Sequence, residues 1–358
     1  MRGVERLELD RNENPYPWPE EWLAELARRL AAHGLGRYPR RRGELEAALA
    51  RYGRESASPP PTGELAVLAT NGSDEALLAA VLAFTRPGEA VVYLEPGFAM
   101  YPQAAEVTGR RARPVPLGER WEVDAAALRA ALAEERAAGR EVLAFLCRPN
   151  NPTGNLWPLE AVEAAAATGA WVLVDEAYFE FAGESALGLV DRYPRLLVSR
   201  TLSKAFGLAG LRLGYVLGRP EAVERLRASL APYTVNAAAV EAGLMLLERE
   251  RLGVVAGWRQ AIVAERERLA AELGRIPGLA VAPSAANFLL FEVDPRRSGW
   301  EARSLWRALD RRGVALRYFG DQVPRLERAL RWSVGRPDED ERALALLREL
   351  VGAREATA

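Results

Sequence analysis

Short apolar runs alternate with amphipathic segments over most of this 358-residue chain, and this alternation restricts its fold more than any other feature. Strand-like runs occur at residues 66–69, 90–94, 142–147, 171–174, 196–199 and 213–217. Helical patterns lie between them, for example at 74–84, 124–135 and 158–167. Apolar strands separated by helices predict an α/β fold with a mostly parallel sheet between two layers of helices.

The pattern becomes long and helical after about residue 219. A second, smaller α/β pattern follows residues 277–278, with a strand at 286–292, a helix at 300–311, strands at 314–317 and 330–334, and a helix at 338–350. We therefore predict an N-terminal arm that packs with the small domain (1–35), a large domain (36–255), a small C-terminal α/β domain (256–352) and a tail (353–358).

Lysine occurs once, at position 204, although lysine and arginine together number 48. Arginine can replace lysine in surface ion pairs, but a guanidinium keeps its proton and cannot attack a carbonyl carbon. The one lysine of so arginine-rich a chain is therefore a candidate for amine chemistry. The alternative is a leftover ammonium on a helix surface.

Composition excludes several classes of protein. A formal net charge of −1 provides no field that would attract nucleic acid or an anionic membrane. The opening segment, MRGVERLELDRNENP, is charged throughout, and no uncharged apolar run reaches the ~18 residues that span a bilayer, so we expect a cytoplasmic protein. The one histidine, His33, is typical of a solvated helix end and the one cysteine, Cys147, of a buried apolar residue. We predict no metal site, no catalytic triad and no disulfide.

Polar residues follow four of the strand-like runs: Asn71, Asn151, Asp175 and Lys204. Open parallel sheets bind ligands at the carboxyl ends of their strands. The four residues are therefore predicted to meet at one edge of the sheet.

The segment LATNGSDEALLAAV is a strand, a turn and a helix start. Ser73 and Asp74 lie where unpaired N–H groups and the helix dipole favour an anion such as a phosphate. A simple N-cap by Ser73 is the alternative. Ser203 precedes Lys204 where a Walker A loop has glycine, and the glycines that follow lack G-x-G-x-x-G spacing, so a nucleotide site is not expected.

Asp175 ends the apolar run WVLVD. A buried carboxylate needs a cation or a metal nearby, and a protonated pyridine nitrogen would serve, since the carboxylate would keep that ring an electron sink. An ion pair with an arginine is the alternative. Tyr178 could reach the same ligand. Asn151, in CRPNNPTG, has a free amide in a rigid turn, although turn chemistry alone also explains it.

The segment SRTLSKAFGLAGLRLGY contains two hydroxyls, Thr201 and Ser203, the single lysine, and Arg212. An aldehyde cofactor with a phosphate requires this set, because the amine forms an imine while the hydroxyls and the guanidinium bind the phosphate.

These segments, in this order, resemble the fold-type I pyridoxal-5′-phosphate (PLP) aminotransferases of the aspartate aminotransferase superfamily, and most closely the histidinol-phosphate aminotransferases. The matching motifs are NENPYP, RYP, NGSDE, NNPTG, DEAYFEF, TLSKAFGLAGLRLGY, ANFLLF and LRWSVG, which cover nearly the whole chain. The resemblance implies PLP-dependent transamination between glutamate/2-oxoglutarate and histidinol phosphate/imidazole-acetol phosphate, a step of histidine biosynthesis, in a ping-pong cycle.

The resemblance also implies a role for each matching residue. Lys204 would form the internal aldimine and move the proton between Cα and C4′. The PLP-binding residues of the large domain would be Asp175 at the pyridine nitrogen, Asn151 and Tyr178 at the 3-oxygen, Tyr101 on the ring face, and Ser73, Asp74, Thr201, Ser203 and Arg212 at the phosphate. The residue reaching a neighbour's cofactor across a homodimer interface would be Tyr38. Substrate would be bound by Arg331 with Arg317, and by Asn14, Tyr16 and Tyr233. Core or surface packing is the alternative for these tyrosines and arginines.

Three departures bear on the substrate. Arg148 stands where the family often has asparagine, Thr234 replaces a usual asparagine, and the turn reads TNGSDE instead of GNGSDE. Two alternatives on the same fold stay open: an aromatic or broad-range aminotransferase, and a threonine-phosphate decarboxylase. A ligand-binding protein of this fold without turnover is a third.

Overall fold

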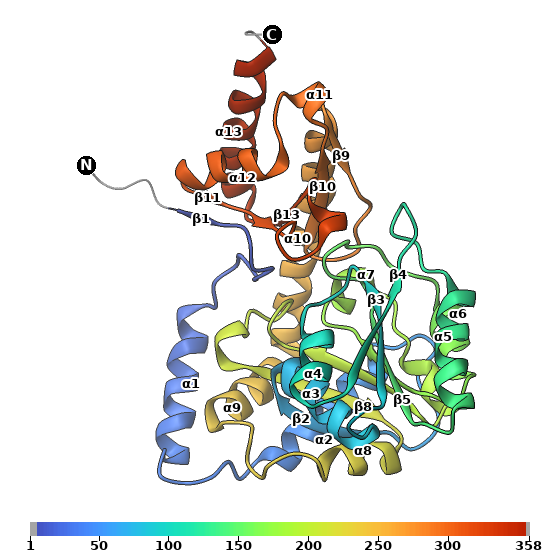
Figure 1. The fold of residues 1–358 in the computed structure, drawn as a ribbon. Helices are drawn as coiled ribbons and strands as arrows, with labels where there is room; N and C mark the ends of the chain where they lie inside the picture. The colour runs from blue at the N-terminus through green and yellow to red at the C-terminus, as the bar shows by residue number, and fades with distance from the viewer. Residues whose placement is uncertain (1–5, 356–358) are drawn as a thin grey trace.

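The computed structural model describes residues 6–355 and consists of two α/β bodies joined by a long helix (Figure 1). The larger body contains a seven-stranded sheet in the order β2-β8-β7-β6-β5-β3-β4. Only β8 runs antiparallel to its neighbours, so the predicted mostly parallel sheet is confirmed. The strands are β2 (Ala66–Asn71), β3 (Ala90–Glu95), β4 (Arg111–Pro116), β5 (Val142–Cys147), β6 (Trp171–Asp175), β7 (Leu196–Thr201) and β8 (Leu213–Gly218).

Helices cover both faces of this sheet, and the alternating side chains of each strand divide between two cores. Val142, Ala144 and Leu146 of β5 face one core, whereas Leu143 and Phe145 face the other. Burial on both faces explains why these strands read as continuous apolar runs. The first core is covered by α2 (Arg42–Glu55), α5 (Ala125–Ala137), α6 (Leu159–Ala166) and α9 (Ala237–Leu246), and the second by α3 (Gly72–Phe84), α4 (Met100–Val107) and α8 (Pro220–Arg227). The short helices are α7 (Phe179–Ala182), η1 (Leu187–Asp191) and η2 (Ala209–Leu211).

The smaller body contains a four-stranded antiparallel sheet in the order β12-β13-β10-β9 and a core of its own. Its elements are β9 (Leu279–Val281), β10 (Phe288–Val293), β12 (Arg317–Tyr318), β13 (Ala329–Ser333), α11 (Pro295–Ser298), α12 (Ala302–Arg311), η3 (Pro324–Leu326) and α13 (Pro337–Glu355). The single strand predicted at 314–317 is wrong, because the chain leaves one sheet and enters another there. The tail predicted from residue 353 is helical as far as Glu355, and residues 356–358 lie outside the described residues.

The N-terminal arm contacts both bodies. Strand β1 (Leu7–Glu8) pairs in parallel with β11 (Val314–Ala315), which follows α12. Helix α1 (Glu20–His33) packs instead on α9, and the ring of Trp22 lies 5.6 Å from that of Trp258 in α10 (Arg249–Gly274). Strand β1 therefore packs on the smaller body and helix α1 on the larger one. The predicted domain boundary at 255/256 falls inside the continuous helix α10, and the division into domains stays a prediction. Within residues 6–355, no helix combines the length and the apolar character needed to cross a membrane.

Candidate active site

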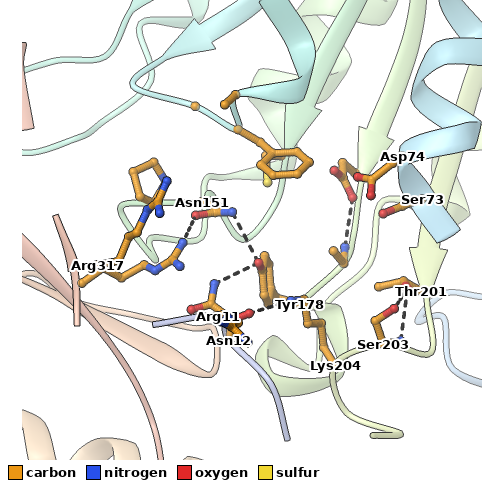
Figure 2. Close-up of a pocket in the computed structure, with 18 of the residues that line it drawn as sticks. Arg11, Asn12, Ser73, Asp74, Asn151, Tyr178, Thr201, Ser203, Lys204 and Arg317 are labelled. Atoms are coloured by element: carbon orange, nitrogen blue, oxygen red, sulfur yellow. Dashed lines mark hydrogen bonds between the residues drawn. The ribbon is translucent and has the colours of Figure 1, made fainter. Parts of the chain in front are cut away.

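A cavity of ≈ 900 Å³ opens at the carboxyl ends of β2, β5, β6 and β7. Residues of the N-terminal arm and of the smaller body complete its wall, so three parts of the chain form one site. Figure 2 places Arg317 on one side, Ser73, Thr201 and Ser203 on the other, and Tyr178 and Lys204 between them. The predicted residues that line the cavity are Ser73, Asp74, Asn151, Asp175, Tyr178, Thr201, Ser203, Lys204, Arg212, Arg317 and Arg331.

One end of the cavity suits an anion. A Cβ atom at Gly214 would lie 2.5 Å from the carbonyl carbon of Gly72 and 2.6 Å from the nitrogen of Ser73, so only glycine lets β8 approach the start of α3. Arg212 adopts a left-handed backbone (φ 56°), and its guanidinium donates to Asp74 Oδ2 at 2.8 Å. A guanidinium and side-chain hydroxyls at a helix N-terminus form a phosphate-binding arrangement. Ser73 does not cap the helix, since the N-cap position is Asn71, without a side-chain cap.

The hydroxyls of Thr201 and Ser203 belong to the same end. Their oxygens lie 2.9 Å apart at the end of β7. Thr201 Oγ1 also accepts the Ser203 backbone N–H at 3.1 Å, which fixes the turn that leads to Lys204. The turn therefore presents two hydroxyls and the amine to one cavity.

Asp175, the last residue of β6, is only 2% exposed. Its carboxylate accepts hydrogen bonds from Tyr101 Oη (2.9 Å), Ala177 N (3.2 Å) and Ser199 Oγ (3.4 Å). In the described part of the chain it has no arginine partner, so the alternative of a structural ion pair is wrong. Burial raises the pKa of this carboxyl to about 6. The carboxylate therefore lacks a cation, and a cationic group of a ligand would stabilise it.

Lys204 is half-buried, and Nζ donates to the carbonyl of Arg11 at 3.2 Å. Nζ also lies 5.8 Å from the ring centroid of Tyr178. Burial, and after it the charge of Arg331, lowers the pKa of this amine to about 8. A substantial fraction of the amine is therefore neutral and nucleophilic near physiological pH. The alternative of a leftover surface ammonium does not fit these contacts.

The other end of the cavity contains two arginines. Arg317 on β12 and Arg331 on β13 are directly opposed in the antiparallel register. Arg331 is 6% exposed and donates to Asn151 Oδ1 (2.6 Å) and to the Asp10 carbonyl (2.7 Å). Burial, and to a lesser extent Arg317, lowers the pKa of Arg331 to about 10. Like charges opposite one another are destabilising, and an anionic ligand between them would remove the repulsion.

The prediction that Tyr101 faces a ligand ring is wrong. Its side chain is buried outside the cavity wall, stacked on Phe145 (5.0 Å between centroids) with its hydroxyl donated to Asp175. Phe98, three residues earlier, lines the cavity instead. The cause is the rotation of the chain into α4, which turns Phe98 toward the cavity and Tyr101 toward the core.

Four further predicted residues do not line the cavity of their own chain. Asn14 Nδ2 donates to the Ala205 carbonyl at 2.8 Å, and Tyr16 lies beside it. Tyr38 and Tyr233 stack on each other at 4.2 Å and are 70% and 55% exposed. Within a single chain these residues therefore do not form a substrate pocket.

Two residues of the NENPYP motif line the cavity, Asn12 and Glu13. Sequence reasoning missed both, although the motif was the signal that could have found them. Two positions that differ from the family motifs, Arg148 and Thr234, lie outside the cavity wall. Arg148 is buried in an ion pair with Glu184 (2.7 Å).

Comparisons with known proteins agree with this geometry. The family described as "Aminotransferase class I and II" matches residues 4–347. A histidinol-phosphate aminotransferase of Roseiflexus castenholzii is 40% identical over 353 residues, covering 97% of this chain and 90% of that protein. The structure of histidinol-phosphate aminotransferase from Sinorhizobium meliloti in complex with pyridoxal-5′-phosphate has a TM-score of 0.80 and 26% identity, and covers 98% of this chain and 92% of that chain. N-succinyldiaminopimelate aminotransferase from Mycobacterium tuberculosis has a TM-score of 0.83 and 28% identity, over 96% and 93% of the chains. Enzymes named for different substrates therefore share this fold.

Proposed function

The chain belongs to the class I and II aminotransferase family, and from this premise we propose that it transfers an amino group between glutamate and imidazole-acetol phosphate, a step of histidine biosynthesis. The products are 2-oxoglutarate and histidinol phosphate. The observation that carries the proposal is one amine with a pKa of about 8, in a cavity with an uncompensated carboxylate and an anion-binding end. Relatives named histidinol-phosphate aminotransferase support the choice of substrate.

The residues present fit PLP as the cofactor. Its aldehyde, ring nitrogen and phosphate match the Lys204 amine, the Asp175 carboxylate and the end formed by Ser73, Thr201, Ser203 and Arg212. Cavities of this size accommodate a cofactor together with a small substrate. Asn151 and Tyr178 face the middle of the cavity, and we assign the ring-facing role predicted for Tyr101 to Phe98.

When bound, PLP supplies an electron-withdrawing ring that stabilises negative charge at the substrate α-carbon. Asp175 holds the proton on the ring nitrogen, because a buried carboxylate stabilises a cation beside it. The Lys204 amine would take the proton from the substrate α-carbon and deliver it to C4′ of the cofactor, a transfer for which an amine with a pKa near the working pH is suited. Arg331 and Arg317 bind the carboxylate of glutamate and the phosphate of histidinol phosphate.

The substrate is tested by turnover of the purified enzyme with glutamate and either imidazole-acetol phosphate or phenylpyruvate. We expect the phosphorylated acceptor to be aminated with the higher kcat/KM. Exclusive amination of phenylpyruvate would instead assign an aromatic aminotransferase. Carbon dioxide release from threonine phosphate would assign a decarboxylase, and binding of PLP without turnover would assign a ligand-binding protein.

Arg317→Ala should raise KM for imidazole-acetol phosphate by about 10- to 100-fold, because the substrate phosphate loses one or two charge-assisted hydrogen bonds. KM for an unphosphorylated acceptor should change far less. The matched control is Arg328→Ala, which removes an exposed arginine 3.9 Å from Asp294 and outside the cavity wall. If KM for imidazole-acetol phosphate is unchanged in Arg317→Ala, Arg317 does not bind the phosphate of the substrate.

We also propose that the active unit is a homodimer in which Tyr38 of one copy completes the cavity of the other. Tyr38 and Tyr233 form an exposed stacked pair, and Leu35, three residues before Tyr38 in the sequence, is 84% exposed. Exposed apolar groups gathered in one place are typical of an interaction surface. A cytoplasmic location and the lack of a nucleic-acid partner stay predictions.

Mixed dimers test whether Tyr38 acts on the partner. Tyr38→Ala and Lys204→Ala chains, each nearly inactive alone, should regain about a quarter of wild-type activity when coexpressed. Half of the dimers are then mixed, and one of their two sites has both an intact lysine and an intact tyrosine. No recovery in purified mixed dimers would place Tyr38 outside the partner's site, and the two parent homodimers are the controls.

A further inference from the structure

Asn12 is a buried residue of the N-terminal arm whose backbone is bound to the smaller body. It is 1% exposed and adopts a left-handed backbone (φ 55°), a conformation that asparagine tolerates. Its N–H donates to Ser333 Oγ at 2.7 Å, and its carbonyl accepts from Asn287 Nδ2 at 3.0 Å. Both partners lie in the smaller body, so Asn12 is fixed to the same sheet that carries Arg331.

The orientation of the Asn12 amide follows from these contacts. Ser333 Oγ already accepts the Asn12 N–H, so its single proton is available for Asn12 Oδ1, 2.9 Å away. Oδ1 is therefore the acceptor side of the amide. The donor side, Nδ2, faces Tyr178 Oη at 3.1 Å.

The amide of Asn151 is oriented in the same way. Arg331 Nη1, which can only donate, lies 2.6 Å from Asn151 Oδ1, so Asn151 Nδ2 faces Tyr178 Oη at 3.4 Å. Figure 2 shows both amides converging on the phenol. Two obligate donors therefore occupy the two lone pairs of one hydroxyl.

A phenol has one proton and two acceptor positions. Because both acceptor positions of Tyr178 are taken by N–H groups, its own proton has to point to a third acceptor. Tyr178 lines the cavity, so an atom of a bound ligand can accept this proton.

We propose that Asn12 is a positioning residue that makes the Tyr178 hydroxyl an obligate proton donor to the bound cofactor, and that ties this donor to strand β13. The inference rests on the proposed function, since PLP has a phenolic oxygen on the ring that such a donor would meet. Donation to that oxygen stabilises its anionic form and lowers the pH at which the visible absorbance of the loaded enzyme changes.

Asn12→Asp tests the donor directly. The aspartate would accept the Tyr178 proton and withdraw it from the cavity. We expect the midpoint of the absorbance titration of the PLP-loaded enzyme to rise by about one pH unit, because the anionic phenolic oxygen of PLP would lose the hydrogen bond from Tyr178.

Asn12→Gly separates loss of the donor from addition of a charge. Glycine adopts φ 55° without strain and removes the amide, so the midpoint should rise again, by less than in the aspartate variant. The control is Asn236→Asp, the same chemical change at the exposed N-cap of α9, where the oxygen can still accept from Ala239 N. It should leave the midpoint unchanged.

The outcomes separate the inference from the proposed function. A wild-type protein that develops no visible absorbance with PLP would contradict the proposed function. A wild-type enzyme that titrates, with an unchanged midpoint in Asn12→Gly, would overturn the inference even if thermal melting showed a loss of stability. If Asn12→Asp does not fold, the glycine variant alone decides.

Discussion

Lys204→Ala is expected to lower the rate of transamination by at least about 10⁴-fold, the largest loss usual for removal of a proton-transfer group. Lys204→Arg should lose as much activity as the alanine variant. It restores the positive charge, but a guanidinium keeps its proton and cannot act as a base or a nucleophile. Steady-state turnover with glutamate and imidazole-acetol phosphate measures both variants.

The pKa of Lys204 makes this prediction specific. The cofactor-free enzyme should bind PLP covalently at a rate that rises with pH, with a midpoint near 8, because only the neutral amine reacts. Borohydride treatment and peptide mapping of the loaded enzyme should leave the pyridoxyl group on residue 204. Substantial activity in Lys204→Ala without an added amine, or a label elsewhere, would remove the central assignment.

Asp175→Asn is expected to have opposite effects on stability and on activity. In the cofactor-free protein the pKa of Asp175 is about 6, above the value of roughly 3.9 for an unfolded aspartate. The folded protein therefore prefers the protonated carboxyl, and the stability that it contributes is present below about pH 4 and is lost as the pH rises through about 6. At pH 8 the asparagine variant should gain about 1–3 kcal/mol in free energy of unfolding. At pH 4 it should gain little.

The same substitution should lower kcat by about 10²- to 10³-fold, because removing one partner of a buried charge pair costs about 3–5 kcal/mol. Urea unfolding at pH 4 and pH 8 measures the stability, and steady-state kinetics measure kcat. Asp191→Asn is a control for which the change in stability at pH 8 should have the opposite sign. Hydrogen bonds from Thr62 and Gly63 lower the pKa of Asp191, so its loss should destabilise the protein at pH 8. An Asp175→Asn protein that is less stable at both pH values would show that the carboxylate is structural.

Much of the fold was predictable because burial on both sheet faces produces continuous apolar strands that local sequence reveals. Strand β4 escaped prediction, since its sequence RARPVP is polar and contains two prolines, which are tolerated at the edge position it occupies. The strand at 314–317 was predicted as one element, because no local pattern indicates that its halves pair with β1 and with β13.

The site was predictable where chemistry limits the choice of residue and not where packing decides. Lys204 was identified because no other side chain of the chain offers a neutral amine, and Asp175 because a buried run ends on a carboxylate. Phe98 and Tyr101 could not be told apart, since both are aromatic and only the packing of α4 determines which one faces the cavity. Asn12 was missed because its partners Tyr178 and Ser333 are 166 and 321 residues away.

The sequence by itself determined the alternation of strands and helices and the one residue capable of amine chemistry, since both depend on residue type and on near neighbours along the chain. The tertiary structure alone decided which side chains face the cavity, how Arg317 opposes Arg331, and which hydrogen-bond donors surround Tyr178. These arrangements follow from contacts between distant segments. Their geometry is determined by how the arm, the sheet and the smaller body pack together.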